Sequence, residues 1–122
     1  MELKIIPGAF TVCKISDPSQ ADLTDAYCFL CKTDAELSLV CRTQRAPAET
    51  LEREDGWRAF RIQGKLDFSL VGVLARITVI LAQRQIGIFA VSTFDTDYIL
   101  TKAADFHPAL KALREEGYRI TA

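Results

Sequence analysis

The stretch that decides the fold begins at residue 67 and reads Asp67-Phe-Ser-Leu-Val-Gly-Val-Leu-Ala-Arg-Ile77. From residue 69 to about residue 83 the apolar residues fall three or four positions apart, which is the spacing of an amphipathic helix. Ser69 is a favourable N-cap, and Asp67 carries the charge that the positive end of a helix favours. The stretch therefore predicts a helix over residues 69–83.

A second apolar run, Ile88-Phe-Ala-Val-Ser-Thr93, follows a turn at residues 85–87. Its length and its β-branched residues predict a strand. Asp95-Thr-Asp97 is typical of a tight turn, and Tyr98-Ile-Leu-Thr101 has the composition of a returning strand. We therefore expect a β-hairpin directly after the helix.

Both flanks of this region extend the alternation of strands and helices. Trp57-Arg-Ala-Phe-Arg-Ile62 alternates apolar and basic residues, which predicts a half-buried strand. Asp105 is expected to cap a second helix with Pro108 in its first turn. Gly117 is expected to end that helix before a short strand at residues 118–120. The resulting order, β-α-β-β-α-β, favours an α+β, ferredoxin-like sandwich with two helices on one face of a sheet.

Residues 1–56 offer strands but little room for helices. Pro18 restricts any helix before residue 26 to about one turn, and residues 42–56 are predicted to be a polar connection with room for a helical turn. The first 56 residues carry a net charge of −4 and residues 57–122 carry +3. We therefore predict a reduced unit at residues 1–56 and a complete unit at residues 57–122. Strands in the first unit are expected at residues 4–6, 9–15, 26–32 and 37–41, with the first two joined at Pro7-Gly8.

The composition excludes several classes of protein. The 122 residues are 49% apolar, which is too high for a disordered chain, and the net charge of −1 argues against a strongly basic nucleic-acid binder. No apolar run approaches the roughly 18 residues needed to cross a bilayer. We therefore expect a cytoplasmic protein that binds neither nucleic acid nor membrane.

Cysteine spacing gives little support for a metal or cofactor. The chain contains Cys13, Cys28, Cys31 and Cys41, and its single histidine, His107, is far from them in sequence. Cys28 and Cys31 fall in an expected strand, where residues three apart point to opposite faces about 10 Å apart. A buried structural role is favoured over metal binding and over redox chemistry, and no cofactor and no metal are expected.

The stretches 67–77 and 86–93, with Leu81 between them, resemble the ACT domain. More narrowly, the stretches 66–74 and 88–98 are similar to small bacterial proteins with two ACT-like units in tandem. Those proteins are related to the regulatory part of aspartate kinase and to the eukaryotic cytosolic arginine sensor. Pro7-Gly8 between two strands and Asp34-Ala-Glu-Leu-Ser38 ahead of a strand extend the resemblance over nearly the whole chain. It implies a regulatory module that binds a small ligand, usually an amino acid, where two units pack together.

The expected site combines groups for both ends of an amino acid. The first amides of the predicted helix suit a carboxylate, and Gly72 leaves room for a ligand. Asp95 and Asp97 can receive an ammonium or guanidinium group, and Ser92 and Thr93 add hydroxyls. The candidate ligand-binding residues are Asp67, Phe68, Ser69, Leu70, Gly72, Ile88, Phe89, Ser92, Thr93, Asp95 and Asp97.

Several of these residues also have a structural interpretation. Gly72 can serve close packing, Asp95 and Asp97 can be hairpin residues, and Phe89 is favoured as a core residue. The leading hypothesis is that the protein is a homodimeric regulatory module that binds an amino acid. The alternative is an interaction or dimerisation module with no small ligand. Catalysis is not expected, because the chain has no asparagine for an acylphosphatase-like site and contains none of the common catalytic motifs.

Overall fold

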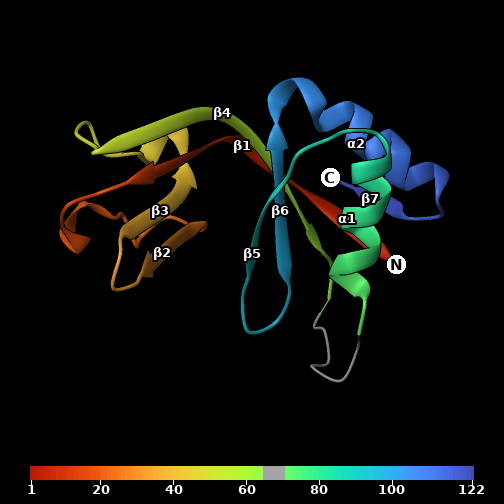
Figure 1. Ribbon diagram of the computed structural model, residues 1–122, viewed down its shortest axis with the longest axis horizontal. Coiled ribbons are helices and arrows are strands. Elements are labelled where there is room, and N and C mark those ends of the chain that lie inside the picture. The colour runs from red at the N-terminus through yellow and green to blue at the C-terminus, as the bar shows by residue number, and fades with distance from the viewer. Residues whose placement is uncertain (65–70) are drawn as a thin grey trace. The chain divides into compact units, whose positions relative to one another are not determined.

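The computed structural model describes residues 1–64 and 71–122 (Figure 1). It is a mixed fold of strands and two α-helices. Contacts divide it into two compact units: unit 1 comprises Met1–Pro7 and Arg58–Ala122, and unit 2 comprises Gly8–Trp57. The elements are, in chain order, β1 (Glu2–Lys14), a 3-10 turn (Pro18–Gln20), β2 (Cys28–Lys32), β3 (Leu37–Arg42), a 3-10 turn (Thr43–Arg45), β4 (Glu52–Ile62), α1 (Val73–Gln83), β5 (Phe89–Ser92), β6 (Asp97–Lys102), α2 (Ala103–Glu115) and β7 (Arg119–Thr121).

In unit 1 the strands follow the order β7-β1-β4-β6-β5. The predicted hairpin is present, with β5 and β6 antiparallel from Phe89 opposite Leu100 to Ser92 opposite Asp97. The start of β1 lies parallel to β7, with Glu2 opposite Arg119 and Lys4 opposite Thr121. This pairing places residues 1–7 with the second half of the chain, whereas we expected them in the first unit.

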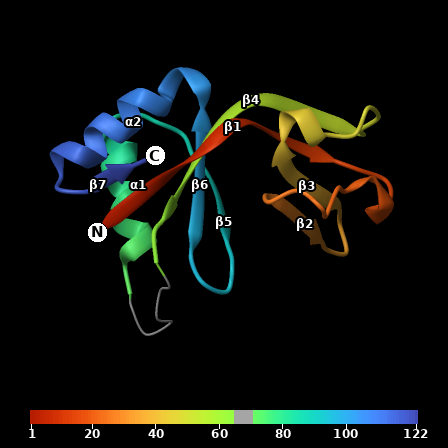
Figure 2. The same cartoon turned by 180° about the vertical axis from the view of Figure 1, so that it is seen from behind.

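Both helices cover one face of this sheet. A single buried cluster joins Phe60 on β4 and Ile99 on β6 to Ile77 and Leu81 on α1 and to Phe106 on α2. The two helices also contact each other, as Figure 2 shows from the opposite side. The apolar spacing predicted an amphipathic helix, and the structure confirms it, because three residues on the inner face of α1 are buried.

The start of α2 differs from the prediction. The helix begins at Ala103, directly after β6, so Asp105 lies in the first turn and Pro108 lies inside the helix. Pro108 cannot donate a hydrogen bond to the preceding turn, but five buried side chains compensate by anchoring the helix. The predicted end is confirmed: Gly117 has a φ of +98°, and the amide of Tyr118 donates to the Leu113 carbonyl at 3.1 Å. The buried residues of α2 are Phe106, Ala109, Leu110, Ala112 and Leu113.

In unit 2 the strands follow the order β2-β3-β1-β4. The strands predicted at residues 4–6 and 9–15 are one continuous strand, β1, in which Gly8 has a φ of +96°. Glycine can adopt this left-handed backbone conformation, so the chain can change direction at residue 8 without ending the strand. We had expected a connection between two strands there. Each of the two stretches that left room for a helical turn, before residue 26 and after Arg42, contains a 3-10 turn.

The predicted polar connection at residues 42–56 is partly wrong, because β4 begins at Glu52. Residues 52–56 are exposed, which explains why they show no apolar alternation. These residues belong to β4, which pairs with β1, and they also make polar side-chain contacts. Thr11, which is buried, donates to Asp55 at 2.5 Å, and Arg53 Nε donates to the same carboxylate at 3.0 Å.

Candidate functional site

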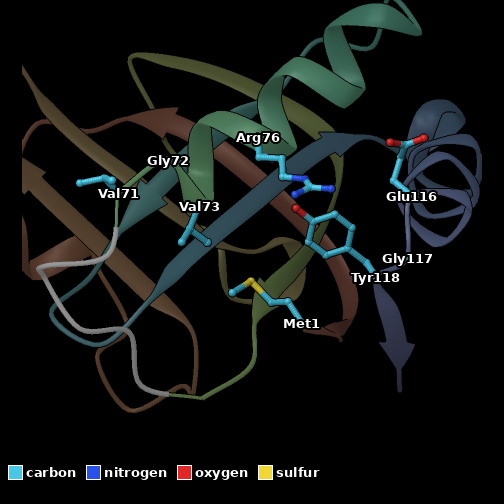
Figure 3. Close-up of a pocket in the computed structure, with 8 residues that line it drawn as sticks. All are labelled: Met1, Val71, Gly72, Val73, Arg76, Glu116, Gly117 and Tyr118. Carbon is cyan, nitrogen blue, oxygen red and sulfur yellow. The ribbon is translucent and has the colours of Figure 1, made fainter.

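A pocket of about 430 Å³ opens at the N-terminal end of α1 in unit 1 (Figure 3). Three segments form it: the first turn of α1, the segment between α2 and β7, and the start of the chain. Its volume is enough for a small metabolite. The lining residues are Met1, Val71, Gly72, Val73, Arg76, Glu116, Gly117 and Tyr118.

The charged groups of this pocket have opposite signs. Arg76 lies one turn into α1, and its amide donates to the Gly72 carbonyl at 2.9 Å. Figure 3 shows the Arg76 side chain extending toward the Tyr118 hydroxyl, while Glu116 lies on the other side of Gly117. Arg76 and Glu116 are exposed, and the Tyr118 ring is buried. A cation and a carboxylate on one small pocket suit a zwitterion, because each of its charges needs a partner.

The start of α1 supplies further donors to this pocket. The N-cap is Gly72, which has no side chain to cap the helix. The first amides of a helix have no carbonyl partner within it, and they lie at the positive end of the helix dipole. Together with Arg76 they suit a carboxylate. The helix begins four residues later than predicted, and the expected cap, Ser69, lies outside the described residues.

The backbone conformation at residue 72 requires a glycine. Its φ is +78°, and among the described residues no atom beyond its chain neighbours lies within 4 Å of the position that a Cβ would occupy. The structural alternative for Gly72, close packing against another backbone, therefore has no support in the described contacts.

We expect Gly72→Ala to destabilise the protein by about 1–2 kcal/mol, because alanine is strained in the left-handed region. Chemical denaturation measures this directly. Gly87→Ala is the matched control: in the described part of the chain its Cβ would meet nothing within 4 Å either, and its φ is not positive. It should be neutral or slightly stabilising. Equal effects of the two substitutions would contradict the conformational explanation.

Two predicted site residues, Thr93 and Asp95, line a different pocket of about 290 Å³. It lies between the end of β4 and the β5–β6 turn. Arg61 donates to the Tyr98 hydroxyl at 3.1 Å and to Gln63 at 3.3 Å, so hydrogen bonds fix its guanidinium. This pocket shares no lining residue with the pocket at α1, so Gly72 and Asp95 line different pockets of unit 1.

The other predicted residues of the hairpin have local partners. Ser92 donates to Asp97 at 2.5 Å across the turn, and the Thr93 amide donates to the Thr96 carbonyl at 2.8 Å. Ile88 packs against the buried cluster, and Phe89 is half-buried in β5. The contacts of Asp97 agree with its interpretation as a hairpin residue, whereas Phe89 is not among the buried core residues, as its structural interpretation had favoured. The role of these residues in ligand binding stays a prediction. Asp67, Phe68, Ser69 and Leu70 lie outside the described residues.

Sequence reasoning missed Met1, Arg76, Glu116 and Tyr118. A signal existed for Arg76, because residues four apart share one face of a helix and Gly72 was already a candidate. No local pattern marks Glu116 or Tyr118, which follow α2 and reach the pocket through the pairing of β7 with β1.

Other kinds of site find no support in the described structure. In residues 1–64 and 71–122, no group of three His, Cys, Asp or Glu side chains is placed to hold a metal ion. Over the same ranges, neither helix is long and apolar enough to cross a membrane. Cys28 and Cys31 lie on opposite faces of β2, as predicted, and all four cysteines are free thiols.

The chain belongs to the ACT domain family, whose model matches residues 52–115. The match confirms the resemblance found in the sequence. ACT domains are regulatory modules that bind small ligands. A comparison with curated proteins gives no match.

Among solved structures, the chain is similar to a protein from Agobacterium tumefaciens, with 31% sequence identity and a TM-score of 0.86. The match covers 98% of this chain and 90% of that one. A protein of unknown function from Vibrio cholerae, described as a possible transport protein, has 18% identity and a TM-score of 0.72, with 91% and 85% of the two chains covered.

Aspartate kinase from Clostridium acetobutylicum, an allosteric enzyme, matches with 13% identity and a TM-score of 0.63. The match covers 93% of this chain but 33% of the kinase. At this identity the similarity shows the fold alone. It agrees with the expected relation to the regulatory part of aspartate kinase.

Proposed function

We propose that this protein is a non-catalytic regulatory module that binds an amino acid in the pocket at the start of α1. One observation carries the proposal: Arg76, the uncapped N-terminal end of α1 and Glu116 all line the same small pocket. Arg76 and the helix amides bind the carboxylate, and Glu116 binds the ammonium group. Membership of a family of regulatory ligand-binding modules supports this assignment.

The proposal includes the tandem arrangement that the sequence suggests. It comprises a reduced ACT-like unit within residues 1–56 and a ferredoxin-like ACT domain at residues 57–122, whose sheet also includes the start of β1 between β7 and β4. The observed order β4-α1-β5-β6-α2-β7 supports the second of these. The lining residues of the pocket all belong to unit 1, so in this proposal the junction of two ACT-like units forms between the two chains of a homodimer. The protein acts in the cytoplasm.

Thermal unfolding in the presence of each of the twenty amino acids tests the proposal. A ligand that binds only the native state at a hundredfold excess over its Kd stabilises it by about 2.7 kcal/mol. We expect one amino acid, or a few related ones, to raise the melting temperature. Isothermal titration then gives the affinity.

Arg76→Gln is expected to weaken that binding by about 10- to 100-fold, which corresponds to the loss of a charge-assisted hydrogen bond. Arg114→Gln is the matched control, because Arg114 is an exposed arginine on α2 that does not line the pocket. If both variants bind like the wild type, the carboxylate is bound elsewhere and the pocket assignment is wrong.

The alternative function is an interaction module with no small ligand. Two exposed apolar side chains at α1 favour it, Val71 and Val79, which are 90% and 54% exposed. If none of the twenty amino acids raises the melting temperature, this alternative replaces the proposal. Sedimentation analysis then measures whether α1 joins two copies, and Val79→Lys should separate them.

A further inference from the structure

Three of the four cysteines lie on one face of the sheet in unit 2. Cys28 is on β2, Cys41 is on the central strand β3, and Cys13 is on β1. All three belong to one apolar cluster, in which Cys13 and Cys41 are buried and Cys28 is partly exposed. Neither the proposed ligand site nor the family assignment accounts for this gathering of thiols.

The strand register selects one pair from this group. Cys28 and Cys41 are direct partners across the antiparallel β2–β3 pair. Direct partners have Cα atoms about 4.5–5.5 Å apart, which is inside the range of about 4.4–6.8 Å that a disulfide accepts. Their side chains also point to the same face, as a disulfide requires.

The other pairs fit less well. Cys13 is opposite Leu39, which makes it a diagonal neighbour of Cys41. Diagonal neighbours are about 7–8 Å apart, beyond the disulfide range. Cys31 is opposite Ser38 and lies on the other face of β2. Cys28 and Cys31 are therefore about 10 Å apart and cannot be joined while β2 remains a strand.

We propose that Cys28 and Cys41 are a site of reversible oxidation to an intramolecular disulfide. The oxidant is a peroxide or a small-molecule disulfide. With hydrogen peroxide, the Cys28 sulfur attacks one oxygen and becomes a sulfenic acid, and the other oxygen leaves as water. The Cys41 sulfur then attacks the Cys28 sulfur and displaces the second oxygen as water. Two thiols lose two electrons and two protons, and one peroxide is reduced to two waters.

The surroundings of the two thiols set the order and the speed of these steps. Cys28 reacts first because it is partly exposed, whereas Cys41 is buried. Burial raises the pKa of Cys41 to about 12 and also raises the pKa of Cys28, where Asp22 and Asp25 add to the effect. Because the thiolate is the reactive form, oxidation is slow at neutral pH and accelerates as the pH rises. The disulfide would fix β2 to β3 covalently.

Oxidation of the whole protein with hydrogen peroxide or oxidised glutathione, followed by a thiol count in denaturant, tests the proposal. The count should fall from four thiols to two in a monomer and return to four after reduction. A count that stays at four, or a loss of thiols only through linked chains, would overturn the proposal.

Peptide mapping identifies the bond. Trypsin separates the cysteines into peptides 5–14, 15–32 and 33–42, which carry Cys13, Cys28 with Cys31, and Cys41. In Cys31→Ser, the matched control on the other face of β2, the linked peptides 15–32 and 33–42 should still form. In Cys28→Ser they should be absent. A bond from Cys13 to Cys41 in the wild type would contradict the assignment.

Discussion

Phe106→Ala is expected to lower the free energy of unfolding by about 3–5 kcal/mol, as large truncations in well-packed cores do. Phe106 is 1% exposed and joins α2 to the sheet of unit 1. Its ring centroid lies 6.3 Å from that of Phe60, and the guanidinium of Arg58 lies 4.5 Å from its centre. Truncation removes all of these contacts at once. The melting temperature should fall by roughly 10–20 °C for a domain of this size.

Phe94→Ala is the matched control for this prediction. It is the same substitution, but Phe94 is 72% exposed in the β5–β6 turn. Surface substitutions usually change stability by less than about 0.5 kcal/mol, so this variant should unfold close to the wild type. A loss below about 1 kcal/mol for Phe106→Ala would mean that α2 contributes little to the core of unit 1.

The core of unit 1 was predictable because its signals are local. Apolar spacing identified α1, the alternation from Trp57 to Ile62 identified the inner half of β4, and turn residues identified the hairpin. In each case the buried side chains lie within one element, so the period of the sequence reports them directly. The family match over residues 52–115 falls on this same region.

The features that were missed depend on long-range or polar contacts. The start of β1 joins unit 1 because it pairs with β7, more than 100 residues later. The first half of β4 is exposed and charged, so it has no apolar period to detect. Its position depends instead on hydrogen bonds such as that from Thr11 to Asp55, which no local sequence pattern predicts.

The residues of the candidate site also divide into those with a local sequence signal and those that depend on long-range contacts. Gly72 was a candidate from the sequence because a glycine near the start of the predicted helix leaves room for a ligand beside the first helix amides. Arg76 could have been added by helical spacing. Glu116 and Tyr118 could not, because their position depends on how α2 ends at Gly117 and how β7 then enters the sheet.

The ion pair between Asp25 and Arg42 is expected to make unit 2 sensitive to acid. The side chain of Asp25 is 3% exposed, and Arg42 contacts both of its carboxylate oxygens, with Nε at 2.9 Å from Oδ2. The hydrogen bonds from Arg42, with smaller contributions from its charge and from the amides of Ala26 and Tyr27, lower the pKa of Asp25 to about 2 against the cost of burial. An unfolded aspartate titrates near pH 3.9.

The direction of the acid effect follows from these values. Above pH 4 the carboxyl is ionised in both states, and the native state holds that charge more favourably. As the pH falls from about 4 to about 2, the unfolded state binds the proton first, so the contribution of the pair to stability is lost over this interval. Denaturation of the wild type and of Asp25→Asn at pH 7 and at pH 2 measures it. The two proteins should differ at pH 7 and converge at pH 2.

A double-mutant cycle separates this pair from the other carboxylates of unit 2. Arg42→Gln should cost more stability at pH 7 than Asp25→Asn, because it leaves a buried charge with fewer donors, whereas asparagine is neutral. In the variant carrying both changes, the cost should be less than the sum of the two, since each single change already removes the ion pair. The coupling should shrink between pH 4 and pH 2 as Asp25 is protonated. Coupling that is equal at pH 7 and pH 2 would show that the contact acts through packing of Arg42 against Tyr27, whose ring lies 5.7 Å from the guanidinium, rather than through charge.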